Sequence, residues 1–220
     1  MNQALPLAVV VGLLLYLARL LPLWLALPTL WAALATAIVA FAYLRQDPQL
    51  LGKTRPALRL LLAPYLHFGR AVAGLWQLAG HTERHEITPG LWVGGWPIFG
   101  APGLHQLDLT AEMPRQGSAA GYANVPMLDG AAMTAAAYAE AVGVAQAWRE
   151  AGHPILIHCA YGHGRSVAVA CGLLLAEGLA PDLDAAFALI QARRKRASLR
   201  PYQRAVVEAW WAQSRVRPIS

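Results

Sequence analysis

The chain has 220 residues, of which 57% are hydrophobic and only 14% are charged, a balance that is unusual for a purely soluble protein. Its net charge of +6 favours an anionic membrane surface or a phosphorylated substrate as partner, and we expect no nucleic-acid partner. Two cysteines are too few for a disulfide framework, which excludes the class of small disulfide-stapled domains.

The first segment, from Leu5 to Leu44, is almost continuously apolar, and Arg19 is its one charged side chain. About 40 helical residues would extend roughly 60 Å, about twice the hydrocarbon thickness of a bilayer. The sequence therefore predicts a hairpin of two transmembrane helices, Leu5–Leu21 and Leu23–Leu44, within a first domain of residues 1–45. A single span with a signal-like start is less consistent, because no Lys or Arg precedes the apolar run.

Cations dominate the residues that follow the predicted hairpin: Arg45, Lys53, Arg55 and Arg59 against Asp47. The positive-inside rule places this flank, and with two spans also the N-terminus, in the cytoplasm. Arg outnumbers Lys, and Ala and Leu are abundant, which indicates a bacterial chain. We therefore expect a two-pass protein of the bacterial inner membrane that contacts anionic phospholipid and has a cytoplasmic C-terminal domain.

Residues 46–82 are expected to form a juxtamembrane linker. Within it, residues 57–80 interleave leucines with Arg59, His67 and Arg70, and Pro64 interrupts the pattern. This pattern favours an amphipathic segment lying on the membrane. A third span and an ordinary globular helix remain open alternatives.

A dense polar cluster, His81–Glu86, marks the start of the third predicted domain, residues 83–220. Strands are then expected around Leu91–Val93, over Leu104–Glu112 and after Tyr122, followed by a helix that Thr134 caps and Gly152 stops. Asp108 and Glu112 are interpreted as loop-positioning acids. Because strands alternate with helices, the sequence predicts an α/β fold with a mainly parallel sheet flanked by helices.

The most informative stretch is the loop of residues 158–166. An apolar strand-like run, Pro154–Ile157, precedes it, and a buried helix-like run, Val167–Leu175, follows it. Glycines in such a loop let consecutive backbone N–H groups turn inward, and the helix N-terminus adds partial positive charge. With the guanidinium of Arg165, these features predict an anion site.

The same electrostatic field should lower the pKa of Cys159 and make it a thiolate nucleophile, to which Ser166 can donate a hydrogen bond. A glycine-rich turn with a structural Cys is the plainer alternative, but it leaves Arg165 unexplained. A zinc site from His158, Cys159 and His163 lacks the paired ligands on a second element that structural zinc usually has. No metal is therefore expected.

The pattern His158-Cys159-x5-Arg165-Ser166 resembles the signature H-C-x5-R-[ST] of the cysteine-dependent phosphatases. The expected first strand ends in Gly94-Gly95, which is similar to the opening of their dual-specificity branch. The resemblance implies a dual-specificity-phosphatase-like domain preceded by the membrane hairpin. It also implies two-step hydrolysis of a phosphomonoester through a cysteinyl-phosphate, without a cofactor.

The resemblance also implies the roles of individual residues. Val125-Pro126-x-x-Asp129 is similar to the family's acid loop, and this similarity implies that Asp129 is the general acid. The alternative is that Asp129 is a turn residue before Gly130. Cys159 becomes the nucleophile, and His158 orders the loop. The phosphate is expected to bind the loop residues Ala160, Tyr161, Gly162, His163, Gly164 and Arg165.

The predicted membrane hairpin favours a phospholipid substrate, and phosphatidylglycerophosphate is the leading candidate because membrane-associated relatives act on it. An anchored tyrosine or dual-specificity protein phosphatase is the alternative. A catalytically silent phosphate-binding module is a third possibility.

Two features after the loop leave alternatives open. Cys171, within the helix-like run, is either a core residue or a redox partner of Cys159. A helix beginning at Pro181-Asp182 leads into the cations Arg193–Arg196 and Arg200, which are either a solvated helix end or a contact with anionic lipid. A final helix is expected over Pro201–Trp210.

Overall fold

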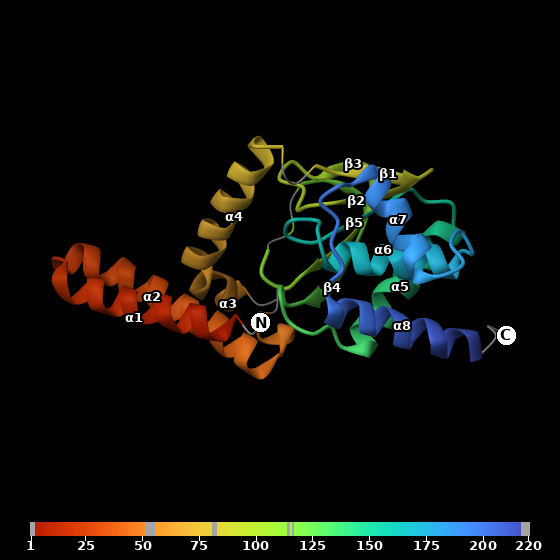
Figure 1. Ribbon diagram of the computed structural model, residues 1–220. Helices are drawn as coiled ribbons and strands as arrows, with labels where there is room; N and C mark the ends of the chain where they lie inside the picture. Colours follow the sequence, from red (N-terminus) through yellow and green to blue (C-terminus); the bar gives the residue numbers. More distant parts are fainter. Residues whose placement is uncertain (1–2, 52–55, 81–82, 114, 116, 217–220) are drawn as a thin grey trace. The chain divides into compact units, whose positions relative to one another are not determined.

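The computed structural model describes residues 3–51, 56–80, 83–113, 115 and 117–216. The chain divides into two compact units (Figure 1): an N-terminal unit of residues 1–72 and 111–114, and an α/β unit of residues 73–110 and 115–220. Lys53 and Arg55 of the expected positive flank, and His81 and Thr82 of the polar cluster, lie outside the described residues.

The N-terminal unit contains the two apolar helices that the sequence predicted, α1 (Ala4–Leu20) and α2 (Leu23–Arg45). They lie side by side, and the chain reverses direction between them (Figure 1). Ala18 of α1 and Ala33, Ala35 and Ala42 of α2 are buried, and such small side chains allow helices to approach closely. Among the described helices, α2 is the one long and apolar enough to cross a membrane; α1 has 17 residues.

Three elements follow: the 3₁₀ turn η1 (Pro48–Leu51), the short helix α3 (Pro56–Leu61) and the longer helix α4 (Ala63–Leu78). The indole Nε1 of Trp31 donates a hydrogen bond to the Leu61 carbonyl at 2.9 Å, which ties α2 to the end of α3. The predicted amphipathic segment is therefore helical over most of its length, and its placement on a membrane stays a prediction.

The α/β unit is built on a five-stranded sheet. Its strands are β1 (His85–Thr88), β2 (Leu91–Gly94), β3 (Ala101–Thr110), β4 (Ala119–Met127) and β5 (Ile155–His158). The order is β1-β2-β5-β3-β4, and every pair except β1–β2 is parallel. The predicted mainly parallel sheet is confirmed. The sequence missed β1, which begins inside the polar cluster and forms a hairpin with β2 through Gly90 at φ +77°.

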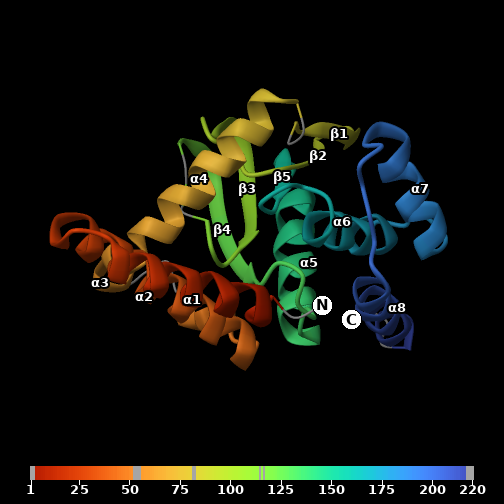
Figure 2. The same cartoon turned by 60° about the vertical axis from the view of Figure 1, so that its left-hand side comes forward.

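The helices of this unit are α5 (Ala135–Glu150), α6 (Arg165–Ala176), α7 (Leu183–Arg193) and α8 (Pro201–Val216). Two of them begin where the sequence predicted: Thr134, the predicted cap, accepts a hydrogen bond from Ala137 N, and Asp182 accepts one from Ala185 N. Helix α6 packs against α5, α7 and α8 (Figure 2), and all of its residues from Arg165 to Leu175 are buried. Strand β5 is also fully buried, so the loop between β5 and α6 is held by two core elements.

Candidate active site

The loop between β5 and α6 begins at the carboxyl end of the central strand. In the sheet, His158 lies in register with Gly94 of β2 on one side and with Asp108 of β3 on the other. The loop then continues from Cys159 to Gly164, and α6 begins at Arg165. The strand–loop–helix arrangement that the sequence predicted is therefore present.

Carbonyl groups of the loop point outward and are held by other parts of the unit. The Ala160 carbonyl accepts a hydrogen bond from Trp96 N at 3.1 Å, and the His163 carbonyl accepts one from Ser198 N at 2.8 Å. Gly162 has φ +70°, and a Cβ at this position would overlap the Gly94 carbonyl and lie 2.5 Å from Gly95 N. Glycine is therefore required here by both conformation and space.

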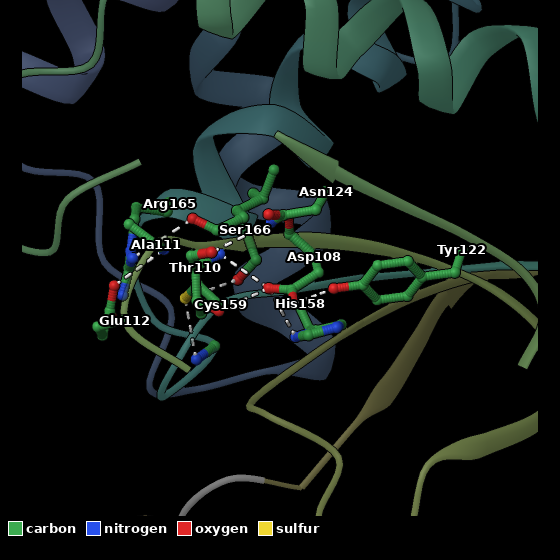
Figure 3. Close-up of polar contacts among 12 residues, drawn as sticks. Asp108, Thr110, Ala111, Glu112, Tyr122, Asn124, His158, Cys159, Arg165 and Ser166 are labelled. Carbon is green, nitrogen blue, oxygen red and sulfur yellow. Dashed lines mark hydrogen bonds and ion pairs between the residues drawn. The ribbon is translucent and has the colours of Figure 1, made fainter. Parts of the chain in front are cut away.

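The sulfur of Cys159 lies inside the turn of this loop, and the residue is 3% exposed. Gly162 N donates a hydrogen bond to it at 3.2 Å, and the Ser166 hydroxyl oxygen lies 3.5 Å away (Figure 3). Donors placed around a sulfur stabilise its anionic form. The structure thus brings Ser166 to the Cys159 sulfur, as the sequence predicted, and adds the Gly162 N–H as a second neighbour.

Arg165 is buried, and its guanidinium reaches the ends of two neighbouring strands. Nη1 donates to the carbonyls of Met127 at 2.6 Å and Leu109 at 3.4 Å, and Nη2 lies 3.4 Å from the Asp129 carboxylate. The guanidinium thus links the loop to the segment that carries Asp129. The Asp129 side chain is half exposed.

A pocket of about 150 Å³ joins these residues. Asp129 and Cys159 line it together with Tyr161, His163, Gly164, Ser198, Arg200, Tyr202 and Gln203. The predicted general acid and the predicted nucleophile therefore face one cavity. The pocket residues from Ser198 onward were not predicted as part of the site. Gln203, for example, reaches the loop through a tertiary contact: its Nε2 would lie 2.7 Å from a Cβ placed at Gly164.

Behind the loop lies a buried polar network centred on Asp108, which is fully buried (Figure 3). One carboxylate oxygen accepts hydrogen bonds from Thr110 N at 2.8 Å and Thr110 Oγ1 at 2.7 Å, and the other accepts one from the Tyr122 hydroxyl at 2.8 Å. Nδ1 of His158 lies 3.9 Å from the carboxylate. Burial, and then the negative charge of Asp108, raise the pKa of Tyr122 well above its usual value, so this hydroxyl remains a donor.

The most important residue that sequence reasoning missed is Arg194, which is 3% exposed. Its Nε donates to the Gly162 carbonyl at 2.6 Å, and Nη2 donates to the Tyr161 carbonyl at 3.0 Å. Its Nη1 contacts the Glu83 carbonyl and lies 3.1 Å from His85 Nδ1. Arg194 is therefore neither a solvated helix end nor free to contact lipid: it fixes two carbonyls of the loop, which orients the adjoining N–H groups.

The chain matches no protein-family model and no curated protein. Among solved structures, human DUSP28 superposes with a TM-score of 0.54 at 20% identity, over 60% of this chain and 98% of its own. The human tyrosine phosphatase-like serine/threonine/tyrosine-interacting protein superposes with a TM-score of 0.53 at 17% identity, over 60% of this chain and 97% of its own. PTPMT1 in complex with PI(5)P superposes with a TM-score of 0.52 at 15% identity, over 62% of this chain and 99% of its own.

These superpositions cover almost the whole of each solved chain but little more than half of this one. At such low sequence identities the superpositions establish the fold alone. The same fold occurs in a protein whose name describes it only as phosphatase-like, so the fold does not by itself establish phosphatase activity. With the parallel sheet and the loop between β5 and α6 described above, they identify this chain as one that has the fold of the dual-specificity phosphatases.

Proposed function

We propose that the chain is a membrane-anchored, cysteine-dependent phosphomonoesterase that acts through a cysteinyl-phosphate. One observation carries the proposal: the Cys159 sulfur receives the Gly162 N–H at 3.2 Å, lies 3.5 Å from the Ser166 hydroxyl and shares its pocket with Asp129. The nucleophile and the acid thereby face one cavity, and the buried Ser166 hydroxyl contacts the sulfur from the protein interior. A structural cysteine would need none of these neighbours.

In the first step, the Cys159 thiolate attacks phosphorus and the bond to the leaving oxygen breaks. Inward N–H groups of the loop and the Arg165 guanidinium stabilise the equatorial oxygens, which is the main contribution to catalysis in such transfers. Asp129 gives its proton to the leaving alkoxide. His158 and the Asp108 network hold the start of the loop in place.

In the second step, water attacks the cysteinyl-phosphate and the S–P bond breaks. The Asp129 carboxylate accepts the proton of the attacking water, which restores the acid for the next cycle. The Ser166 hydroxyl donates a hydrogen bond to the departing thiolate, for which the 3.5 Å separation is suited. Phosphate is released, and no metal takes part in the scheme.

We further propose that the substrate is a phospholipid head group, such as that of phosphatidylglycerophosphate, at the cytoplasmic face of a bacterial inner membrane. Large apolar side chains of the helical hairpin are exposed, among them Leu5 (74%), Val9 (66%), Leu23 (74%) and Trp24 (71%). Such surfaces are expected to be covered by lipid. One solved relative in fold, PTPMT1, has PI(5)P bound.

Two measurements test the proposal in the full-length protein. Cys159→Ser should abolish hydrolysis of para-nitrophenyl phosphate, while Cys171→Ala, the matched control, should retain it; unchanged turnover by Cys159→Ser would remove the nucleophile. Phosphatidylglycerophosphate, phosphatidylinositol phosphate and a phosphotyrosyl peptide should then be compared by kcat/KM. A preference for the peptide would reject the lipid substrate and favour an anchored protein phosphatase.

A further inference from the structure

A second cavity in the α/β unit is strongly basic and lies apart from the active-site pocket. It has a volume of about 300 Å³, and four consecutive cations line it: Arg193, Arg194, Lys195 and Arg196. One carboxylate, from Glu83, and the imidazole of His85 also line it. None of these residues lines the active-site pocket, whose volume is about 150 Å³.

The cations of this basic cavity are poorly compensated. Arg193, Lys195 and Arg196 are exposed and make no ion pair within the described part of the chain. Glu83 and the carboxyl end of α7 offset part of their charge. Burial is the main reason that the pKa of Arg194 lies below its ordinary value; the charges of Cys159 and Glu83 oppose this shift, and the neighbouring Arg196 adds to it. An anion in the cavity would relieve this repulsion.

We propose that the basic cavity is a second anion site, which binds a ligand that carries two or more phosphate-type charges. Its volume lies at the lower end of the range for small-molecule sites and suits a compact phosphorylated group. The cations converge on a hollow instead of spreading over a convex surface. The ligand is either a soluble phosphate ester or the head group of a phosphorylated lipid, which share the same recognition chemistry.

The site is connected to the active-site loop by one side chain. Arg194 lines the basic cavity and donates to the Gly162 and Tyr161 carbonyls of the loop at 2.6 and 3.0 Å. A ligand that attracts this guanidinium therefore acts on the groups that orient the inward N–H donors around the Cys159 sulfur. Any such coupling is reciprocal, so an occupied active site must change the affinity of the cavity by the same factor.

The test uses detergent-solubilised full-length protein alkylated at Cys159 with iodoacetamide, which closes the active-site pocket and removes any dependence on the proposed enzymatic activity. Methylenediphosphonate, which has two linked phosphate-like groups, is titrated by calorimetry. We expect binding by the alkylated wild type and at least tenfold weaker binding by Lys195→Gln/Arg196→Gln. The control Arg204→Gln/Arg215→Gln removes two cations from α8, away from the cavity, and should bind as the wild type does.

Equal weakening in both double variants would show attraction to net charge and overturn the proposal, as would the absence of binding by the wild type both with and without alkylation. A second arm identifies the source of the ligand. The same two variants are compared for binding to phosphatidylcholine vesicles with and without phosphatidic acid. A defect of Lys195→Gln/Arg196→Gln that depends on phosphatidic acid supports a lipid head group, whereas a defect confined to methylenediphosphonate supports a soluble ligand.

Discussion

The strictest test of the loop geometry is the substitution Gly162→Ala. A Cβ at this position would overlap the Gly94 carbonyl and lie 2.5 Å from Gly95 N, and both neighbours are backbone atoms that cannot rotate away. The left-handed conformation costs a non-glycine residue about 1–2 kcal/mol. Overpacking against backbone adds about 1–3 kcal/mol. The expected loss of stability is therefore about 2–5 kcal/mol.

Two control glycines separate these contributions. Gly152 also has a positive φ, +77°, but no described atom lies within 4 Å of a Cβ placed there, so Gly152→Ala should cost only the conformational part. Gly143→Ala lies within helix α5 and is equally unobstructed, so it should stabilise the protein by about 0.5–1 kcal/mol. Thermal unfolding measures the series, at about 2–4 °C per kcal/mol for a chain of this length.

The same substitution should lower kcat/KM by about a hundredfold. The Gly162 N–H that donates to the Cys159 sulfur must move with its peptide, and a displacement of about 1 Å at a catalytic group costs roughly that factor. Gly152→Ala and Gly143→Ala should leave kcat/KM unchanged. The reasoning would be refuted if Gly162→Ala retained the wild-type melting temperature, or if it hydrolysed para-nitrophenyl phosphate at the wild-type rate.

The remaining predictions concern three titratable groups. Asp129→Asn should slow hydrolysis of alkyl phosphates by about 100- to 10,000-fold but slow aryl phosphates with good leaving groups much less; equal effects would contradict its role as an acid. Burial raises the pKa of Cys171 from 9.0 to about 12, so iodoacetamide at pH 8 should modify Cys159 alone. Peptide mass spectrometry identifies the modified cysteine, and modification of Cys171 in the folded protein would contradict its burial. Because this folded-state pKa is raised, the stability that the neutral Cys171 thiol contributes is complete below pH 9 and is lost as the pH rises toward 12. Urea unfolding should therefore give a lower free energy of unfolding at pH 10.5 than at pH 8. In Cys171→Ala, this difference between the two pH values should be smaller. Tyr122→Phe removes a donor to the buried Asp108 carboxylate and should cost about 1–3 kcal/mol by urea unfolding, whereas an unchanged midpoint would mean that the network contributes nothing.

The parts of the fold that the sequence predicted are those whose signals are local. Thr134 and Asp182 accept hydrogen bonds from N–H groups three residues away, and Gly152 adopts a positive φ at the end of α5. The apolar runs on either side of Cys159 likewise predicted β5 and α6. Each of these signals depends on neighbouring residues and survives without knowledge of the rest of the chain.

The missed parts depend on partners that are distant in sequence. Strand β1 is short and partly polar, and pairing with β2 defines it more than its own pattern does. Arg194 belongs to a run of cations that looks like a solvated helix end, yet its partners Tyr161 and Gly162 lie 33 and 32 residues away. Asp108 was interpreted as a loop-positioning acid; its bonds to Thr110 and Tyr122 and its place next to His158 follow from the sheet register.

The position of Arg194 in the sequence affects when the loop can fold during translation. On the ribosome, Cys159 and the glycines around it are made before the guanidinium that pins the carbonyls of Tyr161 and Gly162. A nascent chain that has emerged only through α6 carries every residue of the H-C-x5-R-S signature but lacks the side chain that holds two of its carbonyls. Competence to bind an oxyanion should therefore be acquired abruptly and late in translation, once the end of α7 leaves the exit tunnel.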